Sequence, residues 1–320
     1  MSPASSLAAA KATSGSANAA DPAIHPARDA FDRIATCYDD NFTDSLIGRL
    51  QREAVWRHLG GLLRAGDRIL DLGCGTGADA MLLARRGMEV EALDVSQQMI
   101  AEARRKIDAE GLAGRITTSV LAMEDLGAWD RQSCLSIQPS RKARESETTE
   151  SDRQDCLSHL TPFDAAISNF GAINCVQHLR PVALALGGLI RPGGHVVVGA
   201  ISRFCLWEAV FYSLQGRVPS AARRWSNGGR VVASLGASAG FTVYYRPVHE
   251  IVEAFRPEFR LRRHSGVGVL VPPTYLEAHA RRFPKLMRLA ARIDQSIAAW
   301  PVCRAAADHT LLVFRRERLT

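Results

Sequence analysis

The residues most suggestive of chemistry are an acid and three alternating glycines at the end of a short apolar stretch. The run Arg68–Gly77 reads RILDLGCGTG, with Asp71 two residues before Gly73 and with glycine again at Gly75 and Gly77. Glycine allows backbone angles and close approaches that a Cβ would prevent, and a helix that follows such a turn directs free N–H groups into it. The pattern predicts a site for a nucleotide-type cofactor.

Two cofactors fit these glycines. Gly73, Gly75 and Ala78 satisfy the dinucleotide pattern G-x-G-x-x-G/A, and Asp94 follows 21 residues after Gly73, at the end of the next predicted strand. Asp71 separates the two interpretations, because a carboxylate before the first glycine would repel a pyrophosphate but suits a ligand that carries an ammonium and a sulfonium. S-adenosylmethionine is such a ligand, and a NAD-dependent oxidoreductase is the alternative.

Four sequence blocks resemble one family when they are taken in order and with their spacing. They read DLGCGTG at 71–77, ALDVSQQMI at 92–100, FDAAISNFGAIN at 163–174 and LIRPGGHVVVG at 189–199. Over roughly Phe31 to Arg316 the chain is similar to the class I S-adenosylmethionine-dependent methyltransferases, and among them to the small-molecule and quinone-type enzymes of the bacterial type 11 and type 25 domains. The resemblance implies an α/β, Rossmann-like, doubly wound sheet of seven strands with an antiparallel last strand.

The resemblance also implies a cofactor site. Asp71 and the glycines would face the methionine half, Asp94 would accept hydrogen bonds from both ribose hydroxyls, and Asn169 would place a carbonyl near the ammonium. Cys74 stands where the turn needs a small side chain, which favours packing over a nucleophilic role. The implied cofactor-binding residues are Asp71, Gly73, Cys74, Gly75, Gly77, Asp94, Val95, Met99, Met123, Glu124 and Asn169.

The adenine contacts depart from the family at one position. Val95 and Met99 would line one face of the ring, and the backbone near Met123 and Glu124 would read its edge. Many relatives have an aspartate where this chain has Ala122. We expect Glu124 to replace it.

Two residues are candidates for catalysis. Tyr38, in the segment ATCYD at 35–39, resembles the family's tyrosine near the transferable methyl, and a packing role explains it equally well. His178 comes shortly after the fourth predicted strand and could take a proton from an acceptor, although a surface histidine is the commoner case. No cluster has metal-ligand spacing, so no metal is expected. Further pocket candidates are Asn174, Trp207, Glu208 and Tyr245.

Alternating strand and helix patterns define the domain. The predicted strands are 68–73, 88–95, 116–122, 163–169, 195–201, 259–271 and 309–316, and the last one is reversed. Residues 1–28, rich in Ala and Ser, read as a disordered tail, and 29–320 as the methyltransferase domain. Residues 131–160, with five basic and five acidic side chains, read as a flexible insertion.

Residues 203–257 and 272–300 exceed what a minimal domain needs, and we expect them to form a mostly helical cap that selects the acceptor. Residues 201–320 hold 19 Arg or Lys and 8 Asp or Glu. The stretch 284–300 places Leu286, Leu289, Ile293 and Ile297 on one helical stripe near Lys285, Arg288 and Arg292. The stripe either packs on the cap, which is the commoner arrangement, or makes a peripheral membrane contact.

The composition agrees with a cytoplasmic enzyme that acts on a small-molecule or lipid-like acceptor. Of the 320 residues 47% are hydrophobic, and no run approaches the length of a membrane span. Seven cysteines without C-x-x-C spacing disfavour a disulfide framework. The basic residues lack interleaved aromatics, so no nucleic acid is expected. A cofactor-binding regulatory protein without turnover is a second alternative, and no pattern indicates an oligomeric state.

Overall fold

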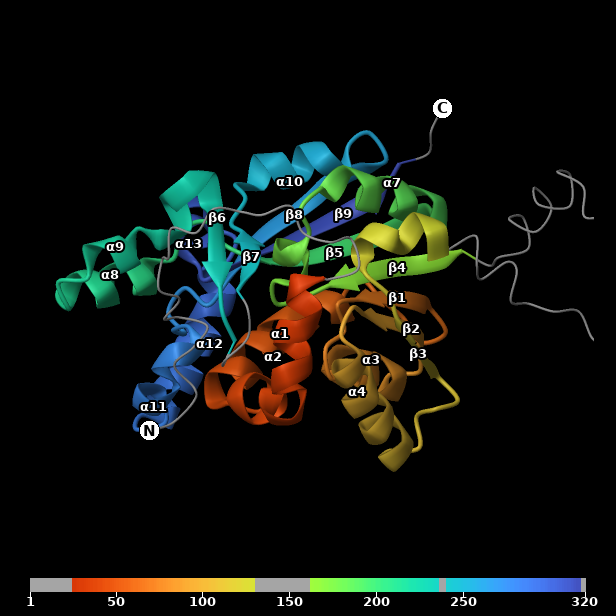
Figure 1. Cartoon of the computed structure of the whole chain (residues 1–320), viewed down its shortest axis with the longest axis horizontal. Coiled ribbons are helices and arrows are strands. Elements are labelled where there is room, and N and C mark those ends of the chain that lie inside the picture. Colours follow the sequence, from red (N-terminus) through yellow and green to blue (C-terminus); the bar gives the residue numbers. More distant parts are fainter. Residues whose placement is uncertain (1–24, 130–161, 236–239, 318–320) are drawn as a thin grey trace, which may run out of the picture.

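The fold is seen in a computed structural model that describes residues 25–129, 162–235 and 240–317 (Figure 1). Seven strands form one sheet in the order β3-β2-β1-β4-β5-β9-β8. All run parallel except β9, which is antiparallel to both neighbours, so the predicted sheet is confirmed. The strands are β1 Arg68–Leu72, β2 Glu89–Asp94, β3 Ile116–Val120, β4 Phe163–Ser168, β5 Ile190–Ile201, β8 Phe259–Val267 and β9 His309–Arg316.

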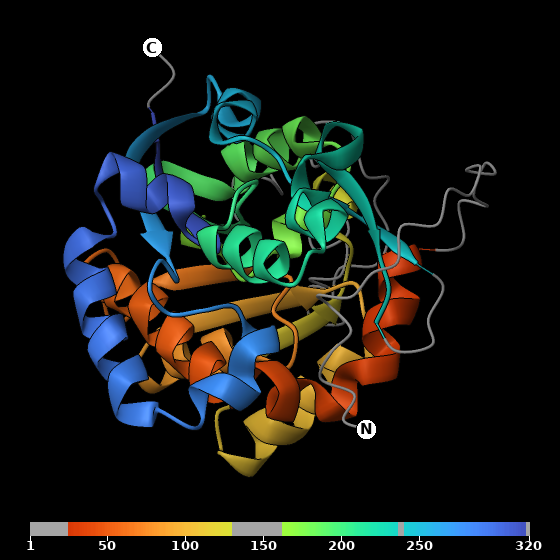
Figure 2. The same ribbon diagram turned by 90° about the vertical axis from the view of Figure 1, so that its left-hand side faces the viewer.

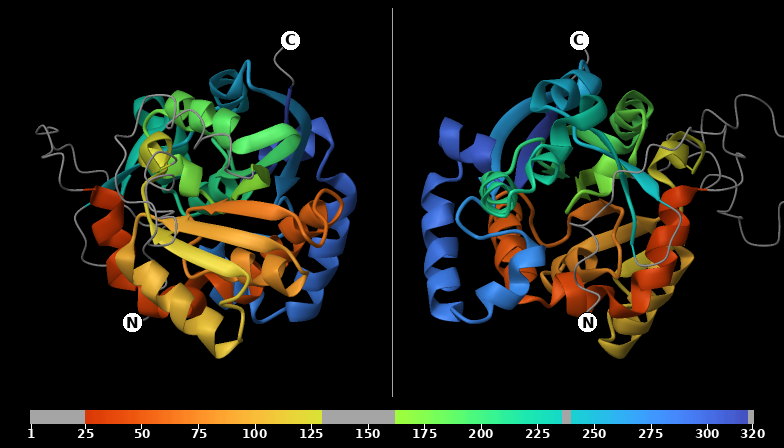
Figure 3. Two further views of the ribbon diagram at one scale, coloured as in Figure 1. Left: turned by 90° about the vertical axis from the view of Figure 1, so that its right-hand side faces the viewer. Right: turned by 60° about the vertical axis from the view of Figure 1, so that its left-hand side comes forward.

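Helices cover both faces of the sheet, because its strands are apolar on both sides. Ile69 belongs to the core under one helical layer and Leu70 to the core under the other, as expected where successive side chains point to opposite faces. The first layer contains α2 (Leu46–Gly60), α3 (Ala78–Arg85) and α4 (Gln97–Ala109), and the second contains α7 (Leu179–Leu189) and α10 (Val248–Phe255) (Figures 1 and 3).

Two strand boundaries differ by four or more residues from those predicted, and the others by two at most. The strand predicted over 259–271 ends early because Gly268 turns the chain with a φ of +74°. β5 begins at Ile190, ahead of the predicted 195, because Ile190 pairs with Phe163 before the register of the β4–β5 ladder shifts. The shift accommodates the Pro-Gly-Gly sequence at 192–194 within the strand.

The N-terminal boundary also needs correction. Helix α1 spans Pro26–Ile34, and Ala27 and Ala30 are buried, so the predicted tail 1–28 extends too far at its C-terminal end. Pro26 begins the helix, where its fixed φ is favourable and its missing N–H costs nothing. The remainder of the tail and the insertion predicted at 131–160 lie outside the described residues.

The predicted cap is only partly a cap. Its first segment, 203–257, includes α10, which packs against α7 and β8 as part of the helical layer over the sheet. The rest of the segment contains a two-stranded antiparallel sheet that packs on α1 (Figure 3). This segment contains α8 Leu206–Leu214, α9 Val218–Ala221, the 3₁₀ segment η6 Arg223–Gly229, β6 Arg230–Ala233 and β7 Phe241–Tyr244.

Helix α12, Pro284–Ile297, packs against α2 with a different face from the one expected. Its buried residues are Ala290, Ala291 and Asp294, while Leu286 and Leu289 are exposed. The commoner arrangement considered above, in which the leucine stripe packs on the cap, is therefore wrong. Among the described residues, no helix is long and apolar enough to cross a membrane. The segments that flank α12 in the chain are η7 Thr274–Leu276, α11 Glu277–Ala280 and α13 Pro301–Ala306.

Candidate cofactor and acceptor site

The glycine turn joins β1 to α3 and needs its glycines. Gly73, Gly75 and Gly77 have φ values of +70°, +54° and +80°, which L-residues with side chains rarely adopt. A Cβ at Gly73 would collide with the Cβ of Ala172, and one at Gly77 would lie 3.1 Å from the Cβ of Ala103. The turn therefore brings bare backbone to the carboxyl end of the sheet.

Asp94 ends β2 and faces this turn. One carboxylate oxygen, Oδ2, accepts a hydrogen bond from the Gly75 N–H, and Oδ1 accepts one from the Ser96 N–H, each at 2.8 Å. Burial raises the pKa of Asp94 to about 6, although these backbone hydrogen bonds act in the opposite direction. Each oxygen keeps a second lone pair for a ligand.

Asp71 lies deeper than expected. Its side chain is buried behind the turn and does not line the cavity described below. Burial raises its pKa well above the ordinary value, and the nearby Asp79 carboxylate adds to this shift. Within the described part of the chain, its Oδ2 has no hydrogen-bond partner. Asp71 therefore lies behind the cavity wall, where it does not touch the cavity.

One cavity of about 220 Å³ runs from the glycine turn to the segments above the sheet. Nine of the predicted site residues line it, while Asp71, Cys74, Gly77 and His178 do not. His178 is exposed at the start of α7, so the structure does not bring it to the site. The nine are Tyr38, Gly73, Gly75, Asp94, Val95, Met99, Met123, Glu124 and Asn169.

The lining falls into two ends. At the cofactor end, Leu121 and Ala122 join the predicted residues, and Ala27 and Phe31 of α1 cover them. Arg28 holds α1 in place, because its Nε donates to the Val95 carbonyl at 3.2 Å. A second part of the lining, here called the acceptor end, adjoins the first, since the ring centres of Phe241 and Phe31 lie 5.5 Å apart. It comprises Cys175, Val176, Ile201, Arg223, Arg224, Phe241, Val243, Tyr245, Tyr275, Asp308 and His309.

A buried arginine that the sequence analysis did not identify stands beside the cofactor end. Arg52 of α2 pairs with Asp79 at 2.9 Å, and Asn169 donates to the other oxygen of Asp79 at 3.1 Å. The Arg52 guanidinium lies 4.4 Å from the centre of the Phe170 ring. Its Nε is buried and has no hydrogen-bond partner among the described residues. No local motif marks Arg52, since it reaches the site from a helix before β1.

Tyr38 lines the same end of the cavity, close to Gly75. Its ring packs against Phe42 with 5.1 Å between the ring centres. Burial raises the pKa of Tyr38 to about 12, so its hydroxyl stays protonated and can donate or accept a hydrogen bond.

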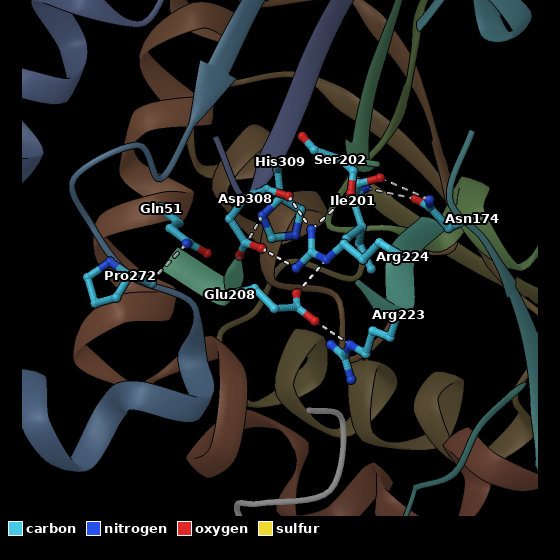
Figure 4. A network of polar contacts seen from close by, with 10 residues as sticks. All are labelled: Gln51, Asn174, Ile201, Ser202, Glu208, Arg223, Arg224, Pro272, Asp308 and His309. Carbon is cyan, nitrogen blue, oxygen red and sulfur yellow. Dashed lines mark hydrogen bonds and ion pairs between the residues drawn. The ribbon is translucent and has the colours of Figure 1, made fainter. Parts of the chain in front are cut away.

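A buried ion network forms one wall of the acceptor end (Figure 4). Arg224 binds Glu208 through Nε at 2.5 Å and Asp308 through Nη2 at 2.8 Å. Arg224 Nη1 also donates to the Ser202 carbonyl, and Arg223 pairs with Glu208 as well. The two arginines and the two carboxylates balance in charge. The network ties α8 and η6 to the start of β9.

His309 lines the cavity beside this network. Its Nδ1 lies 3.3 Å from Asp308 Oδ2, which is ion-pair distance but not the geometry of a well-aligned hydrogen bond. Its ring meets Phe170 edge-on with 5.6 Å between ring centres. Burial alone would raise the pKa of Asp308, but His309 and Arg224 outweigh burial and hold it well below the ordinary value.

Of the four further pocket candidates from the sequence, one lines the cavity and three do not. Tyr245 lines the cavity, with the Arg224 guanidinium 5.3 Å from its ring centre. Asn174 and Glu208 are buried but do not line it; Asn174 instead bonds the backbone of Ile201 and Tyr244. Trp207 packs outside the cavity, against the core between α2 and α12.

Comparison with known proteins is consistent with this geometry. Residues 69–137 match the protein family described as a methyltransferase domain. The ubiquinone biosynthesis O-methyltransferase of Acinetobacter baylyi is 34% identical over 161 residues, which are 49% of this chain and 52% of that protein. The demethylmenaquinone methyltransferase of Tropheryma whipplei is 34% identical over 192 residues, 58% of this chain and 64% of that protein.

A solved structure extends the similarity in fold. The CcbJ methyltransferase from Streptomyces caelestis superposes with a TM-score of 0.52 at 14% identity, over 91% of this chain and 98% of that one. By sequence, residues 69–137 are similar to this methyltransferase domain, and by fold the chain is similar to a methyltransferase of known structure. The chain spans about half the length of the first curated methyltransferases that it matches. S-adenosylmethionine is the cofactor of this methyltransferase family.

The cofactor end fits S-adenosylmethionine. Arg52 Nε and Asp71 Oδ2 are both buried without a hydrogen-bond partner within the described chain. The methionine end of this cofactor carries a carboxylate, which would meet the Arg52 guanidinium in the cavity, and an ammonium, whose charge suits a wall with Asp71 behind it. Asp94 holds two oriented acceptors for a ribose diol. No group of three or more acidic, His or Cys side chains in the described ranges could hold a metal ion.

Proposed function

We propose that the protein transfers the methyl group of S-adenosylmethionine to a small, lipid-like acceptor. The main observation behind this proposal is that Asp94 and the glycine turn line the same cavity as the residues of the acceptor end. An S-methyl sulfonium is already activated, so alignment of an acceptor within such a shared cavity can lower the barrier by about 7–11 kcal/mol. Two separate pockets would not allow this.

Each part of the cofactor end has a proposed task. Arg52 binds the methionine carboxylate, and Asp94 accepts from the ribose hydroxyls. Val95 and Met99 pack on the adenine, and Glu124 takes over the edge contact that Ala122 lacks. Gly73 and Gly75 supply the bare turn, with Asn169 beside it. Asp71, Cys74 and Gly77 support this site from behind the cavity wall.

At the acceptor end we assign proton removal to His309 in place of His178, because His309 lines the cavity and His178 does not. Asp308, whose Oδ2 lies 3.3 Å from His309 Nδ1, would hold the imidazole in place. Tyr38, close to Gly75, would position the acceptor through its neutral hydroxyl. A base of this kind serves an acceptor that loses a proton on methylation, such as a ring hydroxyl.

The lining of the acceptor end favours a lipid-like acceptor. Seven of the eleven residues of the acceptor end are apolar or aromatic, namely Cys175, Val176, Ile201, Phe241, Val243, Tyr245 and Tyr275. The curated relatives named above act in ubiquinone biosynthesis and on demethylmenaquinone, as their names state. These names agree with an apolar ring compound, and a peripheral membrane contact through 284–300 would bring the protein to such a molecule.

The oxidoreductase alternative fits less well. Dinucleotide-binding sheets have the strand order 3-2-1-4-5-6, whereas this sheet inserts the antiparallel β9 between β5 and β8. The buried carboxylate of Asp71, whose Oδ2 has no hydrogen-bond partner among the described residues, would also oppose a pyrophosphate. A regulatory protein that binds the cofactor without turnover is the remaining alternative, and a transfer assay distinguishes it.

Calorimetric titration with S-adenosylhomocysteine and with NAD tests the cofactor assignment. We expect a micromolar Kd for S-adenosylhomocysteine, equivalent to about −8 kcal/mol, and no comparable binding of NAD. Tighter binding of NAD would overturn the assignment.

A further inference from the structure

The outward face of α12 is an apolar stripe that nothing in the described chain covers. Leu286, Leu289 and Ile293 are 55%, 51% and 42% exposed, although each recurs at the helical spacing typical of a packed face. The helix is held instead by Met287, Ala290, Ala291 and Asp294 on its inner side. Asp294 fixes this orientation, because its carboxylate accepts from the backbone N–H groups of Leu270 and Val271 at 2.7 and 3.0 Å.

A basic row runs beside the apolar stripe. Lys285, Arg288 and Arg292 are exposed, and none of them forms an ion pair with another described residue. Asp294 is the only acid of α12 and faces inward. The solvent side of the helix therefore combines apolar and cationic side chains without any anion.

Helix α8 carries a second row of exposed apolar side chains. Leu206, Val210 and Leu214, at successive i, i+4 positions, are 45%, 45% and 83% exposed. Figure 2 shows α8 and α12 on the same side of the molecule. Trp300 and Val302, which follow α12, are exposed as well. We call the exposed residues of α8 and of 284–302 the docking face.

We propose that the docking face binds an anionic lipid bilayer surface. Apolar side chains enter the boundary between headgroups and acyl chains, and the flanking cations bind the negative surface. A second copy of this chain is a poorer occupant, because a two-fold contact would bring Arg288 and Arg292 against the same cations. Nucleic acid would satisfy the cations but not Leu286, Leu289 and Ile293.

The docking face is connected to the cavity by packed aromatic side chains. Trp207 and Phe211, on the inner side of α8, pack against the same core as Met287 of α12. Phe211 in turn contacts Tyr275 with 5.7 Å between ring centres, and Tyr275 lines the acceptor end. A bilayer under this face would thus lie close to the acceptor end. This functional meaning rests on the proposed lipid-like acceptor, whereas vesicle binding itself does not.

Cosedimentation of the full chain with vesicles tests the inference. We expect binding to vesicles that mix phosphatidylcholine with phosphatidylglycerol, and much weaker binding to phosphatidylcholine alone. The double variant Arg288→Gln/Arg292→Gln should bind the mixed vesicles about 30-fold less tightly, since each cation contributes about five-fold. The double variant Leu286→Ser/Leu289→Ser should lose about ten-fold or more.

Matched controls come from exposed sites elsewhere. Leu184→Ser, on α7 and 50% exposed, and Arg86→Gln, after α3, should leave vesicle binding unchanged. All variants should bind S-adenosylhomocysteine as the wild type does, so failure of the cofactor assignment would be seen separately. The inference is overturned if the wild type ignores anionic vesicles, or if the controls weaken binding equally. It is also overturned if the leucine variant merely converts a dimer to a monomer without changing vesicle binding.

Discussion

The carboxylate of Asp94 accepts a hydrogen bond from the backbone N–H of Gly75 at 2.8 Å, so the end of β2 is fastened to the turn that follows β1. This contact holds an acid and a bare backbone loop at the same edge of the sheet. Because burial raises the pKa of Asp94 to about 6, the ionisation of this one group falls within an accessible pH range.

Cofactor affinity should therefore depend on pH. Ribose hydroxyls donate to the ionised carboxylate, so binding favours the deprotonated form of Asp94. The Kd of S-adenosylhomocysteine, measured by calorimetry, should fall about ten-fold between about pH 5 and about pH 7. Asp94→Asn should bind weakly and show little of this dependence. A wild-type Kd that is constant over this range would mean that the ribose is held elsewhere.

The raised pKa of Asp94 should also make the free energy of unfolding of the apoprotein depend on pH. The folded-state pKa of Asp94 lies above the ordinary value of 3.8, so the folded apoprotein prefers the protonated form. Its contribution to the free energy of unfolding decreases as pH rises from about 4 to about 6. In chemical denaturation of the apoprotein, Asp94→Asn should gain stability relative to wild type over this interval. A difference that stays constant with pH would contradict the raised pKa.

The assignment of Arg52 to the methionine carboxylate can be tested with two ligands. Arg52→Gln should weaken S-adenosylhomocysteine by one to two orders of magnitude, because a charge-assisted hydrogen bond of about 1.5–3 kcal/mol is lost. 5′-Methylthioadenosine lacks the amino acid group, so its Kd should hardly change. Equal loss for both ligands would indicate a general disturbance around Asp79, which Arg52 also binds.

The network behind His309 predicts a pH-dependent loss of stability. Asp308 has a depressed pKa, so its stabilisation is present at neutral pH and is lost as pH falls below its ordinary value of 3.8. Asp308→Asn leaves the two arginines of this buried network with Glu208 as their one carboxylate, and urea denaturation should show a loss of about 3–5 kcal/mol at pH 7. This deficit should shrink at about pH 3. An equal deficit at both values would mean that the ion pair is not its source.

The sequence predicted the parts of the fold that follow from local patterns. Alternating apolar strands and helices located the sheet, and the acid at the end of the second strand located Asp94. Arg52, Arg224, Asp308 and His309 could not be found this way, because they come from separate elements with no shared spacing. Only the folded sheet brings the start of β9 beside the end of β5, where His309 pairs with Ile201.

The cap was predicted less well, for a physical reason. The sequence of α12 offers two faces that could pack, one of Leu and Ile and one of Ala and Met. Hydrophobicity favours the first, but the small second face allows a closer approach to α2, and Asp294 needs the backbone donors of Leu270 and Val271. Likewise, the sequence of α10 does not distinguish a cap helix from a layer helix, and only its contacts with α7 and β8 place it in the layer over the sheet.

His309 should matter for transfer but not for cofactor binding. His309→Gln should leave the Kd of S-adenosylhomocysteine unchanged and slow methyl transfer by about 10²-fold or more, the usual contribution of a general base. His178→Gln, at the exposed position, is the matched control and should transfer normally. If His178→Gln is the slower variant, proton removal belongs to the other histidine.

The most direct measurement is transfer of a labelled methyl. The full chain would be incubated with methyl-labelled S-adenosylmethionine and a lipid extract of the source cells, and the organic phase counted and fractionated. We predict label in an apolar product that is absent when Asp94→Ala replaces the wild type. Micromolar binding of S-adenosylhomocysteine without label in any fraction would contradict the proposed activity and favour a regulatory protein.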